Sequence, residues 1–303
     1  MQGLILGAAA FFIGKVLYGN WQALRGQHWT LDPISLFLSC VMLMGSWLWI
    51  ILAWVWLLRR FGARLDWRDA YRIWFLSNIV RYIPGNVWQF LGMVYLCEQK
   101  GIGKLPTLAS IGMHQVLANS TGLLVAMLYY LWVQDTVLLS RVLPMVILLP
   151  LAFIAMQPSL YMGFLTRLLA RVGRLPLTIR FAPLDGPMFG LVYVFSWVLY
   201  GAAFALLVNS IYPLSSAWEW PYLTVVFAAS YVIGFLSLLT PSGLGVREGV
   251  MILLLAPAFS LPVATVISVV SRLWMISGEL FGTGIALFFS KRGIPSGEHD
   301  RPP

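Results

Sequence analysis

The chain has 303 residues, of which 60% are hydrophobic and only 10% are charged, and its mean hydropathy is +0.83. This composition excludes a soluble globular protein and predicts an all-α, polytopic integral membrane protein. The formal net charge of +9 comes from arginines that flank apolar runs. It therefore indicates anionic lipid surfaces as partners and excludes nucleic acid.

Apolar runs long enough to cross a bilayer, or nearly so, recur along the whole chain. In chain order, we expect membrane segments at 3–19, 34–58, 71–97, 106–132, 141–157, 187–210, 221–239, 243–257 and 262–290. Two of these are irregular. The segment 71–97 is interrupted at Pro84-Gly85, and only about 14 helical residues, about 21 Å, follow Gly243, which is short of a ~30 Å hydrocarbon core. The sequence predicts about eight spans and two broken or re-entrant elements.

The distribution of basic residues orients these spans. Three clusters are rich in arginine and lysine: Arg59, Arg60, Arg64, Arg68 and Arg72; Arg167, Arg171, Arg174 and Arg180; and Lys291, Arg292 and Arg301. The positive-inside rule places these clusters and both termini in the cytoplasm. The segment 71–97 must then enter and leave the membrane on one side, turning at Pro84-Gly85. The stretch 158–184 carries an apolar stripe of Leu165, Leu168, Leu169 and Val172 between arginines, which predicts an interfacial helix.

We expect one transmembrane domain over 1–290 and a cytoplasmic tail over 291–303. Within the domain, two halves, about 1–132 and 187–290, show a weak pseudo-repeat and are linked by 133–186. Each half contains a segment broken by proline and glycine. Interrupted segments at corresponding positions of two halves are typical of a transport site near the bilayer midplane.

The sequence Pro241-Ser-Gly-Leu-Gly-Val-Arg-Glu-Gly249 places two charges and three glycines between apolar runs. A helix that starts after Gly245 presents backbone N–H groups, and Arg247 lies in its first turn, so this helix start suits a lipid phosphate. Glu248 would offset Arg247 or contact a cationic headgroup. The alternative is a glycine-rich helix crossing with a buried ion pair that only fixes the packing.

Further polar residues occur inside predicted spans. Arg272 and Glu279 are two helical turns apart, on one face, and are expected to face the interior and pair with Glu248 and Arg247, or to snorkel to an interface. Arg81, Asn86 and Gln89 flank the Pro84-Gly85 break. They would line a polar cleft, unless Arg81 only caps a helix end. His114 fits either a packing role or a proton-coupled one.

Two motifs carry a resemblance. Residues 241–248 resemble the P-x-G-x-G-x-R-E signature of the lysylphosphatidylglycerol synthase transmembrane-region family, and Arg81-Tyr-Ile-Pro-Gly85 resembles its I-P-G element. The resemblance implies a lipid flippase of a bacterial or archaeal cytoplasmic membrane. The two-domain members join this region to a soluble aminoacyl-lipid synthase domain. No such domain lies within these 303 residues, so the resemblance does not imply lipid aminoacylation.

The sequence therefore predicts translocation of an anionic phospholipid, or of a lipid-linked phosphate such as a polyprenyl phosphate sugar. The predicted binding residues are Arg247, Glu248, Gly243, Gly245, Arg81, Asn86, Gln89, Arg272 and Glu279. No catalytic constellation, metal site or cofactor motif is evident, so we do not expect an enzyme. The alternative function is a non-transporting scaffold that binds lipid for a glycosyltransferase or lipid synthase partner. The sequence is compatible with a monomer and with an oligomer.

Overall fold

The computed structural model describes residues 25–26, 29–82, 87–128, 157–171, 179, 181–237 and 243–291, except for the side chains of 81–82 and 289–291. The predicted segment 3–19, nearly all of 141–157, the Pro84-Gly85 turn and the tail beyond 291 lie outside these ranges. Within them the chain forms helices and no strand, which confirms the all-α prediction.

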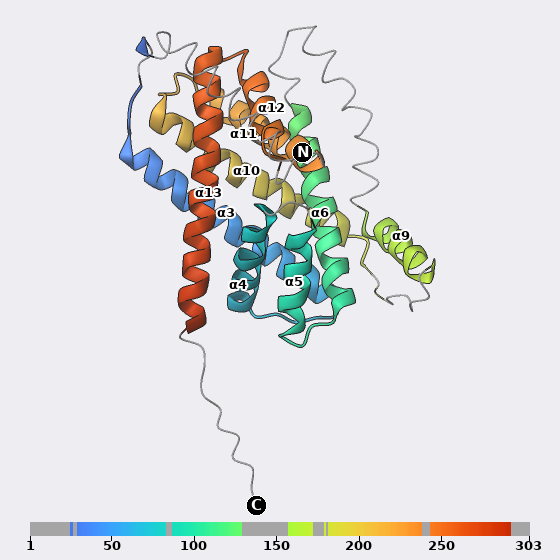
Figure 1. Ribbon diagram of the computed structural model, residues 1–303. Coiled ribbons are helices and arrows are strands. Elements are labelled where there is room, and N and C mark those ends of the chain that lie inside the picture. Colours follow the sequence, from blue (N-terminus) through green and yellow to red (C-terminus); the bar gives the residue numbers. More distant parts are fainter. Residues whose placement is uncertain are drawn as a thin grey trace, which may run out of the picture.

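The helices follow the predicted segments closely (Figure 1). They are α3 (Pro33–Arg60), α4 (Trp67–Asn78), the 3₁₀ helix η1 (Ile79–Tyr82), α5 (Trp88–Glu98), α6 (Lys104–Met127), α9 (Pro158–Arg171), α10 (Asp185–Ile211), α11 (Glu219–Leu236), α12 (Val246–Leu255) and α13 (Leu261–Lys291). Among them α3, α10, α11 and α13 are long and apolar enough to cross a membrane. The chain is thus a multi-pass helical membrane protein.

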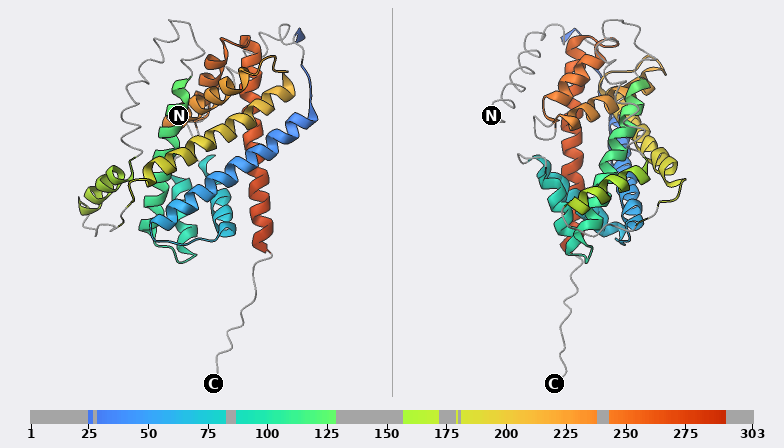
Figure 2. Two further views of the ribbon diagram at one scale, coloured as in Figure 1. Left: turned by 180° about the vertical axis from the view of Figure 1, so that it is seen from behind. Right: turned by 90° about the vertical axis from the view of Figure 1, so that its right-hand side faces the viewer.

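Helices α3 and α10 lie side by side and run antiparallel (Figure 2). At one end, the backbone N–H of Asp32 donates to the carbonyl of Ser210 at 2.9 Å. At the other end, the guanidinium of Arg60 lies 2.7 Å from the buried carboxylate of Asp185. Contacts at both ends fix the register of this helix pair. The two ends of the molecule are therefore named below by the ends of α3, the Asp32 end and the Arg60 end.

Helices α4 and α5 form a hairpin that begins and ends at the Arg60 end of α3. Lys100, just after α5, lies 2.7 Å from Asp69 in the first turn of α4. The two helices have 12 and 11 residues, about 18 and 17 Å, so neither is long enough to cross a ~30 Å core. The two ends of the hairpin meet, as expected for a segment that enters and leaves on one side.

Helices α11 and α12 form a second hairpin, which begins and ends at the Asp32 end of α3. The hydroxyl of Tyr222, near the start of α11, donates to the carbonyl of Leu254, near the end of α12. Helix α12 has 10 residues and is about 15 Å long. This confirms the prediction that the helix after Gly243 is too short to cross the hydrocarbon core. The two hairpins thus extend from opposite ends of the molecule, α4–α5 below and α11–α12 above in Figure 1.

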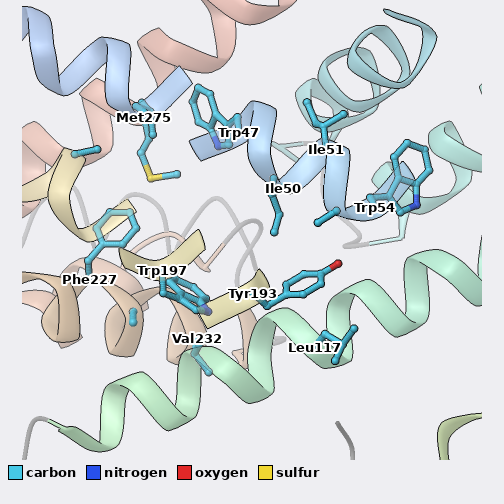
Figure 3. Packing of buried hydrophobic residues seen from close by; sticks show 14 of the residues in the cluster. Trp47, Ile50, Ile51, Trp54, Leu117, Tyr193, Trp197, Phe227, Val232 and Met275 are labelled. Carbon is cyan, nitrogen blue, oxygen red and sulfur yellow. The ribbon is translucent and has the colours of Figure 1, made fainter. Parts of the chain in front are cut away.

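The long helix α13 runs past both hairpins and ties them together. Ser268 donates to the carbonyl of Glu248 in α12, at 3.2 Å, and the carbonyl of Gly282 accepts from the hydroxyl of Tyr71 in α4, at 3.1 Å. In the core, α3, α10, α11 and α13 contribute the buried side chains Trp47, Trp197, Phe227 and Met275 to one hydrophobic cluster (Figure 3).

A helix, α9, is present in the stretch where an interfacial helix was predicted, but its apolar stripe is placed differently, and Val172 of the predicted stripe lies outside the described residues. Leu169 is buried and Leu165 packs on the protein. The exposed apolar face consists of Leu160, Phe164 and Leu168, one turn apart from each other. The difference arises because one side of the helix faces α6, where the Tyr161 hydroxyl donates to the carbonyl of Ala109 at 2.9 Å.

Candidate functional site

A cavity of about 300 Å³ is lined by residues from both hairpins and from α3, α6, α10 and α13. Its charged lining residues are Arg247, Arg272 and Glu279. Its amide and imidazole residues are Asn78, Gln89, Gln115, Asn119 and His114. Most of the remaining wall is aromatic: Trp47, Trp74, Phe75, Phe90, Trp197, Tyr200, Phe227, Tyr231 and Phe235. Residues that flank both predicted interruptions therefore line one cavity.

The second interruption depends on two glycines with positive φ. Gly243 has φ 67°, and Gly245, the N-cap of α12, has φ 85°. Both values lie in the left-handed region that glycine adopts without steric cost. A Cβ at position 243 would lie 2.6 Å from the carbonyl oxygen of Gly234, and one at 234 would lie 2.8 Å from the Cβ of Arg247. The spacing of these glycines lets the start of α12 lie directly against α11.

This close approach places Arg247 among aromatic rings of α11. Its guanidinium lies 4.9 Å from the ring centroid of Phe227 and 5.2 Å from that of Tyr231. Only 4% of the residue is exposed. A planar guanidinium stacked on aromatic faces retains in-plane N–H groups that can bind an oxyanion. The rings of α11 therefore hold the guanidinium of Arg247 in the cavity wall.

Glu248 lies next to Arg247 in sequence but is not part of the cavity lining. Its Oε2 accepts from the backbone N–H of Gly245 at 2.6 Å, which caps the start of α12. Its Oε1 lies 3.6 Å from Nε of Arg272 on α13. The cross-helix pairing of Glu248 with Arg272 is thus confirmed. The geometry makes Glu248 a positioning residue, while a direct contact with lipid stays a prediction.

Arg272 and Glu279 are both buried, with 7% and 6% of their surface exposed, and both line the cavity. The alternative that they snorkel to an interface is therefore wrong for this fold. They share a face because seven residues make about two helical turns. That face looks toward the hairpin tips because α13 contacts both hairpins.

At the first interruption, the amide Nε2 of Gln89 donates to Oδ1 of Asn78 at 2.7 Å. This bond joins α5 to α4 across the break, and both residues line the cavity. The backbone of Arg81 belongs to η1, but its side chain and the whole of Asn86 lie outside the described residues. Of the three binding residues predicted near Pro84-Gly85, Gln89 is therefore the one whose side chain the structure describes.

Sequence reasoning gave no binding role to several residues of the lining. Asn78 and the aromatic residues of α11 were not singled out, and neither Gln115 nor Asn119 was given a binding role. His114 makes the contacts of a packing residue, since Nδ1 lies 2.7 Å from the hydroxyl of Tyr193 and its ring packs on Trp74. It also lines the cavity. Polar residues in the middle of apolar helices were the signal that could have found these amides.

The chemistry of this site is that of a binding cavity. Two guanidinium groups and one carboxylate line it, and Glu248 stands behind Arg272. Among the described residues, no group of three or more His, Cys, Asp or Glu side chains could hold a metal ion. Arg247 and Arg272 have the chemistry to bind an anion. Glu279 and the amide oxygens have the chemistry to accept hydrogen bonds from donor groups of a ligand.

A comparison with protein families agrees with the two motifs. The family described as "Lysylphosphatidylglycerol synthase TM region" matches residues 2–277. The match covers both hairpins and the first part of α13, and it includes Arg247 and Arg272 but ends just before Glu279. A search of curated proteins found no match. The chain belongs to the lysylphosphatidylglycerol synthase transmembrane-region family.

Proposed function

We propose that the protein translocates a lipid with a phosphate headgroup across the cytoplasmic membrane, with both termini in the cytoplasm. The headgroup enters the cavity between the hairpin tips while the acyl or prenyl chains remain in the bilayer. Membership of a family named after a lipid synthase's membrane region supports a lipid as the ligand. The observation that carries the proposal is the single cavity lined by Arg247, Arg272 and Glu279, at the ends of two opposed, interrupted helices.

The energetic barrier to flipping is the transfer of a charged headgroup through hydrocarbon. A charge at the bilayer centre costs several kcal/mol even with favourable relaxation. Buried guanidinium groups lower this cost because they replace water in the solvation of the phosphate. A cavity of about 300 Å³ is at the lower end of the size range of small-molecule pockets, so it suits a headgroup rather than a whole lipid.

The ends of α4, α5, α11 and α12 that face each other line the cavity, and the two hairpins open toward opposite ends of the molecule. A cavity lined by two such hairpins can open to one side or the other when either hairpin moves. This arrangement supports alternating access around a fixed site, as in transporters that have interrupted helices at their midplane.

The test is a flipping assay with purified protein in liposomes that contain headgroup-labelled lipids. The probes are phosphatidylglycerol and a polyprenyl phosphate. We expect the protein to accelerate loss of label asymmetry for at least one phosphate lipid. Arg247→Ala should lower this rate by about tenfold to a hundredfold, since a charge-assisted hydrogen bond to phosphate contributes about 1.5–3 kcal/mol.

The matched control is Arg68→Ala, which removes an exposed arginine of α4 that does not line the cavity. It should leave the rate unchanged. If the protein binds these lipids but accelerates none of them, the chain is a lipid-binding scaffold for an enzyme partner and the transport proposal fails. A chemically altered lipid product would instead indicate an enzyme.

A further inference from the structure

One wall of the cavity offers hydrogen-bond acceptors, which a phosphate cannot use. The clearest is Oδ1 of Asn119 on α6. Nδ2 of this amide donates to the carbonyl oxygen of Gln115 at 2.7 Å. A carbonyl only accepts, so this bond fixes which end of the amide is nitrogen. Oδ1 is buried and has no hydrogen-bond partner among the described residues. A buried acceptor without a partner costs about 1–3 kcal/mol, so this atom points to a ligand that donates.

A continuous aromatic wall connects Arg247 with the region of Asn119. The guanidinium lies over Tyr231, and the Tyr231 ring packs edge-on against Trp197, with centroids 5.5 Å apart. Nε1 of Trp197 donates to the carbonyl of Ala118, the neighbour of Asn119, at 3.1 Å. The polar edge of this indole is therefore occupied, and its carbon surface is what it can offer to the cavity.

The cavity thus has three neighbouring parts in space: an anion site, an aromatic surface and a neutral hydrogen-bond acceptor. We propose that the headgroup is a glycosyl phosphate. Its phosphate binds at Arg247, its sugar ring lies along Tyr231 and Trp197, and one of its hydroxyls donates to Oδ1 of Asn119. This inference rests on the proposed function, in that it takes the cavity as the headgroup site.

Other headgroups fit the three parts less well. A bare phosphate leaves the aromatic surface and Asn119 unused, and a choline group has no hydrogen-bond donor. An ammonium group is a donor, but the unsatisfied acceptor is a neutral amide oxygen, and the carboxylate of Glu248 is already paired with Arg272. A neutral hydroxyl matches this acceptor without bringing a further charge into the cavity.

Binding can be measured separately from flipping, because Trp47, Trp74 and Trp197 line the cavity and their fluorescence should respond to a ligand. The probes are dodecyl phosphate, dodecyl phosphate carrying a hexose, and dodecyl phosphoethanolamine, titrated into the full chain in detergent. We expect the hexosyl probe to bind about fivefold or more tightly than dodecyl phosphate. One neutral hydrogen bond accounts for about a fivefold change.

The variant Asn119→Leu should remove this preference, so that the hexosyl probe binds no more tightly than dodecyl phosphate. Asn119→Asp keeps acceptor oxygens and should retain at least part of the preference, which separates a lost acceptor from a disturbed helix. Equal binding of the two phosphates by the native protein, or tightest binding of phosphoethanolamine, would overturn the inference. A clear hexose preference without any lipid flipping would instead leave the inference standing and remove the transport function.

Discussion

The carboxylate of Glu248 lies 3.6 Å from the guanidinium Nε of Arg272, and this pair joins the start of α12 to the middle of α13. The side chains are only 7% and 9% exposed. The same carboxylate caps α12 by accepting from the Gly245 N–H. One side chain thus holds the start of α12, where Arg247 lies, against the helix that carries the other cavity charges.

We expect Glu248→Ala to destabilise the protein by about 3–5 kcal/mol, because it leaves Arg272 as a buried charge without its carboxylate. Glu248→Gln should cost less, since an amide oxygen can still accept from Gly245. The double variant Glu248→Gln/Arg272→Gln should be less destabilised than the sum of the single variants by about 1–3 kcal/mol. Reversible unfolding in mixed micelles measures all three, and additive values would contradict the ion pair.

The glycines of the second interruption should respond differently to alanine. Gly243→Ala introduces a Cβ at 2.6 Å from the Gly234 carbonyl at a positive φ, so we expect a loss of several kcal/mol or of folding. Gly249 lies inside α12, where a Cβ meets nothing within 4 Å. Gly249→Ala should therefore be neutral or stabilising by up to about 1 kcal/mol. Thermal stability in detergent distinguishes the two, and equal effects would argue against the close approach of α11 and α12.

The aromatic rings beneath Arg247 should contribute to ligand affinity without contacting the phosphate. Replacing Phe227 by leucine keeps an apolar side chain but removes the quadrupole under the guanidinium, which lies 4.9 Å away. A buried cation–π contact contributes about 2 kcal/mol, so we expect about a tenfold or larger loss of phosphate binding. Phe204→Leu, a buried ring of α10 that does not line the cavity, is the control. Similar losses in both variants would indicate general loosening of the core.

The predicted orientation can be tested by cysteine labelling in a background with Cys40→Ala and Cys97→Ala. Gln99→Cys places a thiol at the open end of the α4–α5 hairpin, and Ala217→Cys places one between α10 and α11; both positions are exposed. A membrane-impermeant maleimide added to intact cells should label position 217 and not 99. Inside-out vesicles should show the reverse. Labelling of both positions from one side would contradict the opposed hairpins, and a reversed pattern would contradict the positive-inside orientation.

The N-cap of α3 should make stability depend on pH below about 4. Hydrogen bonds from the Ser35 hydroxyl and the Ile34 N–H hold the pKa of Asp32 below its usual value. Because the pKa is lower in the folded state, the stabilisation is fully present above the unfolded pKa of about 3.9 and is lost as the pH falls through the folded value. Asp32→Ala should lower the melting temperature at pH 7, and its difference from the native protein should shrink below about pH 4. A difference independent of pH would exclude this role.

Much of this protein is determined locally by its sequence. Hydropathy defines the segments, because a helix in lipid must bury its backbone polar groups within about 20 apolar residues. Pro84-Gly85 and the run from Pro241 to Gly245 mark the two interruptions. The number of residues after Gly245, compared with the thickness of the bilayer, predicts that the helix there is too short to cross it. The pairing of Arg272 with Glu248 was also foreseeable, since buried charges need partners.

The tertiary structure decided which of these features meet. The amides of Asn78 and Asn119 belong to different helices, and no sequence period places them with Arg247 in one cavity. Their convergence depends on how α4 and α12 pack against α13 and how α6 packs against α11. This packing is set by side-chain shape across helices rather than by local propensity. Packing likewise placed Glu248 behind the cavity wall, although its neighbour Arg247 lies within it.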